Sequence, residues 1–362
     1  MNDRRLTDAE KDTLVAWTKS GAKEGNVKDA PPAREFADGW KIGKPDLVLD
    51  IGTEYKVPAK GTVEYTYFMI PTGLTEDRWV KEIEVRPTAR AVVHHAVLFS
   101  RTPQAKGMFL PKAQPGEGFV PKQGSGPKVH KPDEGEGSFY LLNMASALEV
   151  VSVYVPGGDP YVTRPDQARL LRAGSDLILQ MHYTANGSET VDRSKVGIVF
   201  AKEPPKERVI NTFVANERLH IPPGDPNWRV VARATMYADA KVQGFFPHMH
   251  LRGKAMEYKA IYPTGETEIL LSVPKYDFNW QMTYQLAKPL LLPKGTTVEV
   301  SAWYDNSPNN PSNPDPKSDV YWGEQSWEEM LAGFIDFVIP ADMNPTEIAV
   351  PKKAVSATAG LE

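Results

Sequence analysis

Residues 63–67 read Val-Glu-Tyr-Thr-Tyr, and this short alternation of apolar and polar side chains is typical of a half-buried β-strand. Similar short segments recur at 81–85, 91–99, 177–183, 196–200, 230–237, 256–262, 297–304 and 334–339. No helix-length periodic segment separates them within either half, so a parallel βαβ architecture is not expected. The chain is therefore predicted to be all-β, with two consecutive antiparallel β-sandwich domains of jelly-roll-like type.

One short helix is expected before these strands, over residues 6–21. Thr7 and Glu10 form a capping box at its start. Pro204-Pro205 separates the two sets of strands and is taken as the domain boundary. The predicted organisation is a helix and linker, a first domain, a second domain and a tail, at 1–45, 46–205, 206–352 and 353–362.

The composition excludes several classes of protein. Hydrophobic residues make up 41% of the 362 residues and charged residues 24%, which is the balance of a soluble globular protein. A net charge of −4 without a basic stripe argues against a nucleic-acid partner. No apolar run approaches the roughly 18–20 residues that a membrane span requires. The absence of cysteine excludes disulfides, thiolate metal sites and cysteine nucleophiles.

Two pairs among the seven histidines could bind a metal. His248 and His250 are separated by one residue, so on a strand their side chains would project from the same face toward a single ion. His94 and His95 are neighbours, and neighbouring side chains of a regular strand point to opposite faces. This second pair reaches one metal only at a bulge or a strand end; otherwise one ring faces inward and the other outward.

The other candidate residues are ambiguous one at a time. His182 lies in the apolar segment 177–183, where a core histidine is the commoner interpretation. His130 is expected to be exposed in a stretch rich in Gly, Pro and Lys, and His220 stands alone. Imidazole suits Zn, Cu, Fe and Ni, whereas a thioether selects Cu(I). Met330 follows a second predicted capping box, Ser326 with Glu329, and by itself is a core methionine.

As an ordered set, these residues resemble the copper type II, ascorbate-dependent monooxygenases, the family of peptidylglycine α-hydroxylating monooxygenase and dopamine β-monooxygenase. Four motifs carry the resemblance, which covers about residues 46–350. They are Val-His-His-Ala-Val-Leu-Phe (93–99), Leu-Gln-Met-His-Tyr (179–183), Pro-His-Met-His-Leu-Arg-Gly (247–253) and Glu-Glu-Met (328–330).

The resemblance implies two copper ions with different tasks. The first copper would store and pass electrons, and its ligands would be His94, His95 and His182. The second copper would bind O₂ beside the substrate, and its ligands would be His248, His250 and Met330. Gln180 would help to order water between the coppers, unless it is only a polar filler of the surface. The implied reaction is hydroxylation of an activated C–H bond by O₂, with ascorbate or another one-electron reductant as co-substrate.

The sequence departs from the peptide-amidating branch of this family. Phe246 stands where that branch has an arginine that grips the peptide carboxylate, and Ala332 and Phe334 stand where it has Asn and Tyr. An unpaired carboxylate would be costly to bury there. Phe246 and Phe334 therefore suggest a small apolar or aromatic substrate. The animal members are rich in disulfides, so this chain is interpreted as a bacterial-type member without cysteines.

Other interpretations remain open. The N-terminal helix resembles the closing helix of a c-type cytochrome, which would make it the remnant of an upstream domain and a cytochrome c-type protein the electron donor. A simple docking helix is the alternative. From the family alone, a periplasmic or secreted location is expected, although no signal peptide follows Met1. The rival functions are a non-catalytic periplasmic copper-binding or transport protein, and a zinc hydrolase with one three-histidine site.

Overall fold

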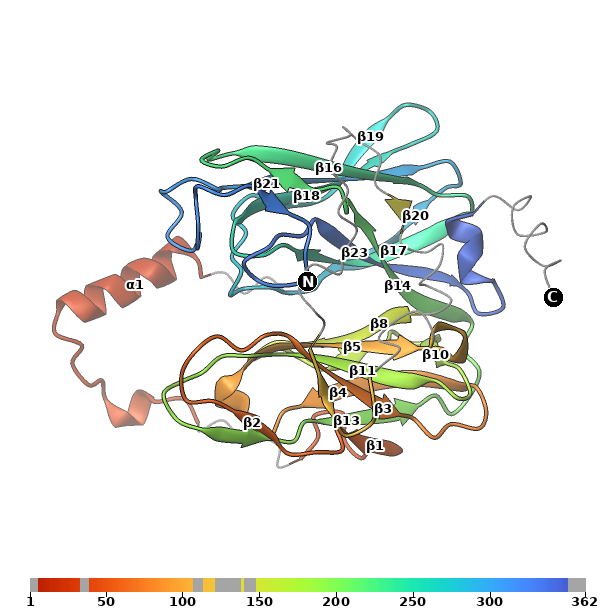
Figure 1. Ribbon diagram of the computed structural model, residues 1–362, viewed down its shortest axis with the longest axis horizontal. Helices are drawn as coiled ribbons and strands as arrows, with labels where there is room; N and C mark the ends of the chain where they lie inside the picture. The colour runs from red at the N-terminus through yellow and green to blue at the C-terminus, as the bar shows by residue number, and fades with distance from the viewer. Residues whose placement is uncertain (1–5, 33–38, 107–112, 121–137, 140–147, 351–362) are drawn as a thin grey trace.

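The structure is a computed structural model that describes residues 6–32, 39–106, 113–120, 138–139 and 148–350. It confirms the predicted fold class: the protein is all-β, with two stacked groups of strands and a single α-helix (Figure 1). His130 and the predicted tail 353–362 lie outside the described residues.

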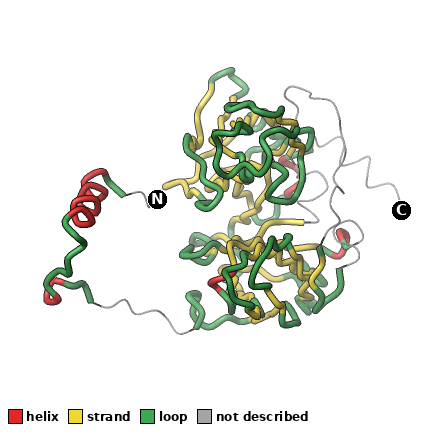
Figure 2. Tube along the Cα trace, turned by 60° about the vertical axis from the view of Figure 1, so that its left-hand side comes forward, coloured by secondary structure: helices red, strands yellow, loops and turns green. Residues whose placement is uncertain are grey.

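The predicted N-terminal helix is present as α1 (Asp8–Lys19). Its capping box is confirmed, because Glu10 N donates to Thr7 Oγ1 at 3.3 Å and Thr7 N donates to the Glu10 carboxylate at 2.7 Å. None of its residues is buried, and Figure 2 shows the helix standing apart from the strands. Its apolar side chains Leu14 and Trp17 are about half exposed, so α1 adds nothing to the core.

The first half of the chain carries thirteen strands in sequence order. They are β1 (Leu47–Asp50), β2 (Tyr55–Val57), β3 (Thr66–Pro71), β4 (Arg78–Arg86), β5 (Val93–Arg101), β6 (Gly118–Phe119), β7 (Ser138–Phe139), β8 (Leu148–Tyr154), β9 (Tyr161–Val162), β10 (Gln167–Leu171), β11 (Asp176–Tyr183), β12 (Thr190–Asp192) and β13 (Lys195–Phe200). The predicted strand at 63–67 overlaps β3 only at Thr66 and Tyr67.

The second half carries the remaining strands. Each of the four segments predicted in this half, 230–237, 256–262, 297–304 and 334–339, overlaps one of them. They are β14 (Glu207–Ala215), β15 (His220–Ile221), β16 (Trp228–Thr235), β17 (Ala240–His248), β18 (Gly253–Ile261), β19 (Thr267–Val273), β20 (Tyr284–Leu292), β21 (Thr297–Tyr304), β22 (Val320–Tyr321) and β23 (Ala332–Pro340). Short 3₁₀ helices occupy Val27–Asp29, Arg90–Val92, Pro103–Ala105 and Pro345–Ile348.

Each half is a sandwich of two sheets, and one sheet is shared. A ten-stranded sheet runs in the order β1-β13-β4-β10-β14-β23-β17-β20. Its two other strands are β9, which pairs with β4, and β7, which pairs with β14. The sheet β6-β3-β11-β5-β8 covers it in the first half, and β16-β21-β18-β19 covers it in the second. The halves join where β10 and β14 pair in parallel, with Gln167 opposite Glu207. The sequence did not predict this continuous sheet.

Two large hydrophobic cores fill the sandwiches, besides a small third cluster of Tyr65, Tyr67 and Ile178. One lies between residues 51 and 198 and the other between 210 and 349, on either side of Pro204-Pro205. Large fully buried side chains such as Phe68, Leu98 and Phe337 lie in them. Because no disulfide is present, burial of this apolar surface is the main stabilising term.

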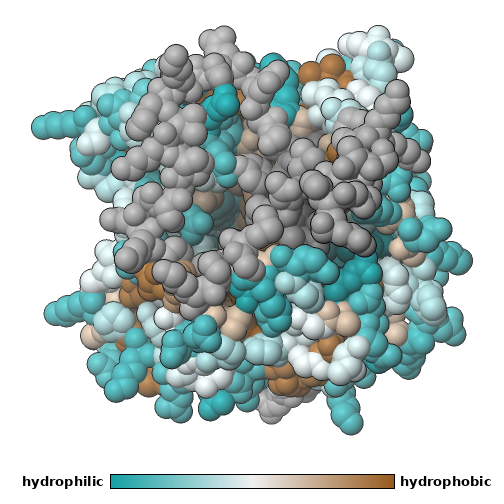
Figure 3. All heavy atoms as spheres, turned by 45° about the vertical axis from the view of Figure 1, so that its right-hand side comes forward, coloured by the Kyte–Doolittle hydropathy of each residue, from teal (hydrophilic) through white to brown (hydrophobic). Residues whose placement is uncertain are grey.

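On the face shown in Figure 3, apolar side chains form small patches among hydrophilic ones. Within the described residues, the structure has no helix whose length and hydropathy would allow it to cross a membrane.

Candidate metal centre

Three histidines from the first half form a compact cluster. His95 lies opposite His182 in the β5–β11 pairing, and Tyr183 already pairs with Val93, so His94 is the extra residue of a β-bulge. The bulge turns both neighbouring rings toward one point. Two adjacent histidines can bind the same metal only under this condition. Each pair of ring centroids is 5.0 or 5.1 Å apart, and one ligand atom from each ring lies within 4.8 Å of the others.

The hydrogen bonds of this first cluster indicate which ring nitrogens remain for a metal. His94 Nε2 lies 3.2 Å from Asn279 Oδ1, so Nε2 carries the proton and Nδ1 carries the lone pair. His94 Nδ1 is 2.9 Å from His95 Nδ1. Two nitrogens bound to one ion at about 2.0 Å lie about 3 Å apart, so the spacing fits a shared cation. His182 Nδ1 is buried without a hydrogen-bond partner among the described residues.

The second cluster forms where β17 ends. His248 is the last residue of that strand and His250 follows it, with the two ring centroids 5.2 Å apart. His248 Nδ1 is 2.8 Å from Gln281 Oε1, and His250 Nδ1 is 3.3 Å from the Glu328 carbonyl oxygen. Both Nδ1 atoms are therefore the protonated ones, which leaves Nε2 of each ring as the candidate ligand atom.

Met330 lines the same cavity as these two histidines. Its backbone is fixed by two contacts: Tyr304 Oη donates to its carbonyl at 2.8 Å, and its N–H lies 3.3 Å from Glu329 Oε2. The side chain is half-buried rather than part of a closed core. A thioether beside two neutral imidazoles is a donor set that suits copper, above all Cu(I).

The Glu329 carboxylate holds the backbone of this second cluster in place. The predicted capping box with Ser326 is wrong, because no helix forms there and the carboxylate points inward. Its oxygens accept from His250 N at 2.9 Å and from Arg252 N at 2.6 Å, besides Met330 N. Burial raises the pKa of Glu329 to about 7, and these backbone hydrogen bonds oppose the rise. One buried carboxylate thus ties the His250 and Met330 segments together.

A single loop between β19 and β20 contacts both clusters. Phe278 stacks on His94, with centroids 5.3 Å apart and an interplanar angle of 17°. Its centroid is also 6.2 Å from that of His182 and 6.5 Å from that of His250. Two positions of the same loop supply Asn279 Oδ1 to the first cluster and Gln281 Oε1 to the second. One phenylalanine ring therefore lies close to histidines of both clusters.

Asn279 and Gln281 are expected to support metal binding at separate sites. Loss of a hydrogen-bond partner behind a ligand typically lowers metal affinity by about 10–100-fold. Asn279→Ala should therefore weaken copper at the first cluster only, and Gln281→Ala at the second only. Competition titration with a Cu(I) chelator measures both affinities. His220→Ala is the control, because that ring bonds to Asp319 Oδ1 at 2.6 Å, outside both clusters. Equal affinities in all three variants would contradict this assignment.

All five clustered histidines are held neutral. Burial is the main cause that lowers the pKa of each of them, and nearby imidazoles add to it for His95, His182 and His250. The pKa of His182 falls to about 3. Neutral imidazoles are the form that binds a metal.

The metal-free protein should lose stability in acid for the same reason. An unfolded histidine takes up a proton near pH 6.5, whereas these rings resist protonation until lower pH, down to about 3 for His182. The unfolded state then binds more protons, so the free energy of unfolding should fall as pH drops below 6.5, by about 1.4 kcal/mol per pH unit for each neutral ring. Urea unfolding at pH 7, 6 and 5 measures the slope, and a flat profile would contradict it. His182→Gln should reduce it.

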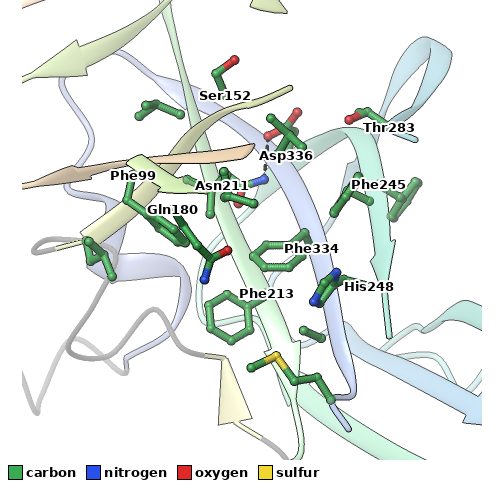
Figure 4. A pocket seen from close by; sticks show the side chains of 18 of the residues that line it. Phe99, Ser152, Gln180, Asn211, Phe213, Phe245, His248, Thr283, Phe334 and Asp336 are labelled. Atoms are coloured by element: carbon green, nitrogen blue, oxygen red, sulfur yellow. Dashed lines mark hydrogen bonds between the residues drawn. The ribbon is translucent and has the colours of Figure 1, made fainter. Parts of the chain in front are cut away.

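An apolar cavity of about 290 Å³ adjoins the second cluster. Figure 4 shows Phe334 beside His248, with Phe213 next to it and Gln180 reaching in from the first half. Phe246, 9% exposed, also lines it, and its ring centroid is 5.9 Å from that of Phe334. Gln180 Nε2 bonds to Tyr67 Oη, which donates to Glu324 Oε2 at 2.9 Å. Every predicted substrate-pocket residue therefore lines one cavity beside His248.

Sequence reasoning missed several residues of the site. Phe278, Asn279 and Gln281 lie in a loop with no histidine motif, and only the fold brings it to His94. Phe213 lies in β14, whose partner β23 carries Phe334; the centroids of these two rings are 4.9 Å apart. Along β14, the half-buried Phe213 alternates with buried neighbours, a pattern that the structure reveals and the sequence does not.

Comparison with known proteins adds little. No protein-family model matches the chain, and no curated protein matches it. Among solved structures it is similar to the major capsid protein P2 from bacteriophage PM2, at 8% identity and a TM-score of 0.31, covering 81% of this chain and 97% of that one. It is also similar to the VP2 subviral particle of infectious bursal disease virus, at 9% identity and a TM-score of 0.21, covering 83% and 72%. Likenesses this weak carry no argument about function.

Proposed function

We propose that this chain is a two-copper monooxygenase that hydroxylates an activated C–H bond of a small apolar or aromatic molecule. O₂ is the oxidant, and ascorbate or another one-electron reductant supplies electrons. The observation that carries the proposal is the presence of two histidine clusters that share Phe278 as a neighbour. One offers His94, His95 and His182, and the other offers His248 and His250 with Met330 in the same cavity.

The donor sets fit copper better than the metals of the rival functions. Among the described residues, neither donor set includes a carboxylate, which non-haem iron sites of the two-histidine type require. A zinc hydrolase needs one site, and a second cluster with a thioether has no role in it. Copper bound at these residues would supply one-electron transfer at the first cluster and O₂ activation at the second.

The protein's own residues would then divide the remaining work. Ring N–H groups of His94, His248 and His250 donate to Asn279 Oδ1, Gln281 Oε1 and the Glu328 carbonyl oxygen, respectively, so each of these three imidazoles presents one lone pair. Phe246 and Phe334 exclude water from the second cluster and hold an apolar substrate beside it. Gln180 presents its amide to the same cavity, where it can order water between the clusters.

The proposal includes the partners and the location. The reductant would reach the first cluster either as ascorbate or as a cytochrome c-type protein, and we place the enzyme in the periplasm or outside the cell, as in the family it resembles. A copper carrier without catalysis is the rival function. The cavity beside the second cluster favours the enzyme, since a carrier has no use for an apolar chamber next to its metal.

Copper content and O₂ consumption measured together test the proposal. We expect two copper ions per chain and O₂ consumption that requires both copper and ascorbate. His220→Ala should leave both values unchanged, whereas His95→Ala should remove one copper and stop the consumption. Two coppers without any O₂ consumption would support the carrier, and one tightly held zinc would support the hydrolase.

A further inference from the structure

A carboxylate oxygen of Asp336 in the cavity beside the second cluster accepts no side-chain hydrogen bond from the described residues. Asp336 is 5% exposed and lines the cavity. Its Oδ1 accepts from Arg169 Nη2 at 2.8 Å and from Asn211 Nδ2 at 2.9 Å. Both side-chain hydrogen bonds of Asp336 within the described residues are made by Oδ1, so Oδ2 can accept one from a ligand. Figure 4 shows Asp336 and Asn211 above Phe334, in the same pocket as His248.

Gly244 keeps space open next to this oxygen. The residue lines the cavity at an irregularity in β17, where the pairing shifts between Val242 and Gly244. A Cβ atom at position 244 would lie 3.2 Å from Asp336 Oδ2 and 3.0 Å from Gln285 Nε2. Both distances are tighter than ordinary van der Waals contact. Any side chain at 244 would therefore crowd the approach to Oδ2.

The charge of Asp336 is already balanced. Arg169 bridges two carboxylates: its Nη2 lies 2.8 Å from Asp336 and its Nη1 lies 2.6 Å from Glu149. Arg208 also approaches Glu149, at 3.8 Å. Two guanidinium groups thus face two carboxylates, with no excess charge to attract a cation. A buried ammonium would lose its hydration without a counter-ion of its own. An uncharged donor loses much less.

Two further carboxyl groups line the cavity, Glu217 and Glu324. Burial is the main cause that raises the pKa of both. Their neutral forms are thereby favoured, which again suits a ligand without charge.

Three phenylalanine rings form part of the remaining wall. Phe213 and Phe334 have ring centroids 4.9 Å apart, and Phe246 packs on Phe334 from another side. Rings in this arrangement accept a flat apolar body and exclude water from it.

We propose that the cavity binds a small uncharged molecule whose apolar body packs against Phe213, Phe246 and Phe334 and whose hydroxyl group donates a hydrogen bond to Asp336 Oδ2. The inference rests on the proposed function in one respect, since that function makes the bound molecule a substrate. It adds the chemical class, an alcohol or phenol, and identifies Asp336 as the residue that selects it.

Binding of matched probes to the full chain tests this without any turnover. The probes are 2-phenylethanol, ethylbenzene and 2-phenylethylammonium, measured by calorimetric titration with and without copper. A hydrogen bond to a charged acceptor predicts that 2-phenylethanol binds about 10- to 100-fold more tightly than ethylbenzene. The ammonium probe should bind more weakly than the alcohol. Because binding needs no catalysis, a failure of the monooxygenase proposal would leave this result intact.

Three variants locate the effect. Asp336→Asn and Gly244→Ala should each remove most of the preference for 2-phenylethanol over ethylbenzene; Gly244→Ala leaves the Arg169 ion pairs in place, so it guards against a folding defect of the first variant. Phe213→Leu is the control, because it should weaken both probes and leave their ratio unchanged. Equal binding of alcohol and ethylbenzene to the unmodified protein, tighter binding of the ammonium, or no binding of any probe would each overturn the proposal.

Discussion

Met330→Ile is expected to abolish substrate-dependent O₂ consumption while the protein stays folded and keeps the copper at its first cluster. Isoleucine has nearly the volume of methionine, so the substitution should cost less than about 1.5 kcal/mol of stability. Met330 is the only sulfur-containing residue among the described residues that line the cavity. The substitution therefore removes the soft donor that stabilises reduced copper. The loss of activity should exceed the roughly 10–100-fold that follows loss of an outer hydrogen-bond partner.

A second methionine provides the matched control for this experiment. Met343 is half-buried and packs against the core of the second half, away from the cavity. Met343→Ile should retain both coppers and full O₂ consumption. Copper analysis, thermal unfolding and an oxygen electrode give the three readouts. Normal turnover by Met330→Ile would show that Met330 is a packing residue and no ligand.

Glu329→Ala is expected to have the largest effect on stability of any single change near the site. The carboxylate is fully buried and accepts from the backbone N–H groups of His250, Arg252 and Met330. Alanine leaves these donors without an acceptor, at about 1–3 kcal/mol for each buried group. The free energy of unfolding should therefore fall by about 3 kcal/mol or more, and copper at the second cluster should be lost with it.

The neighbouring glutamate separates this effect from a general loss of charge. Glu328 is only partly buried, and its side chain accepts one hydrogen bond, from Gln325 N at 2.9 Å. Glu328→Ala should cost about 1 kcal/mol or less. Urea unfolding of the two variants compares them directly. Similar losses in both would mean that Glu329 does not tie the two ligand segments together.

Much of the fold could be predicted from local patterns. Alternating polarity placed most strands, and Thr7 with Glu10 placed the start of α1, because these signals depend only on near neighbours in the chain. The shared ten-stranded sheet could not be predicted, since the parallel pairing of Gln167 with Glu207 depends on how two distant segments meet. Ser326 and Glu329 have capping-box spacing, yet the buried backbone donors around Glu329 outweigh that local preference.

The candidate site was likewise only partly predictable from the sequence. The spacing of His248 and His250 indicates a shared face without further information. His94 and His95 can share a metal only because of a β-bulge, and no residue in β5 indicates one. The bulge is visible only in the shifted register of the pairing between β5 and β11. The grouping of His94 and His95 with His182, and of Met330 with His248 and His250, came from the ordered resemblance to a copper family. Phe278 and Asp336 carry no motif, because their importance lies in contacts made across the fold.

The most direct test of the two-copper assignment is an anomalous difference map, collected on either side of the copper absorption edge, from crystals of the copper-loaded protein. Two copper peaks are expected. One should lie among His94, His95 and His182, and the other among His248, His250 and Met330. A single peak, a peak that follows the zinc edge, or copper bound only at surface residues such as His220 would contradict it.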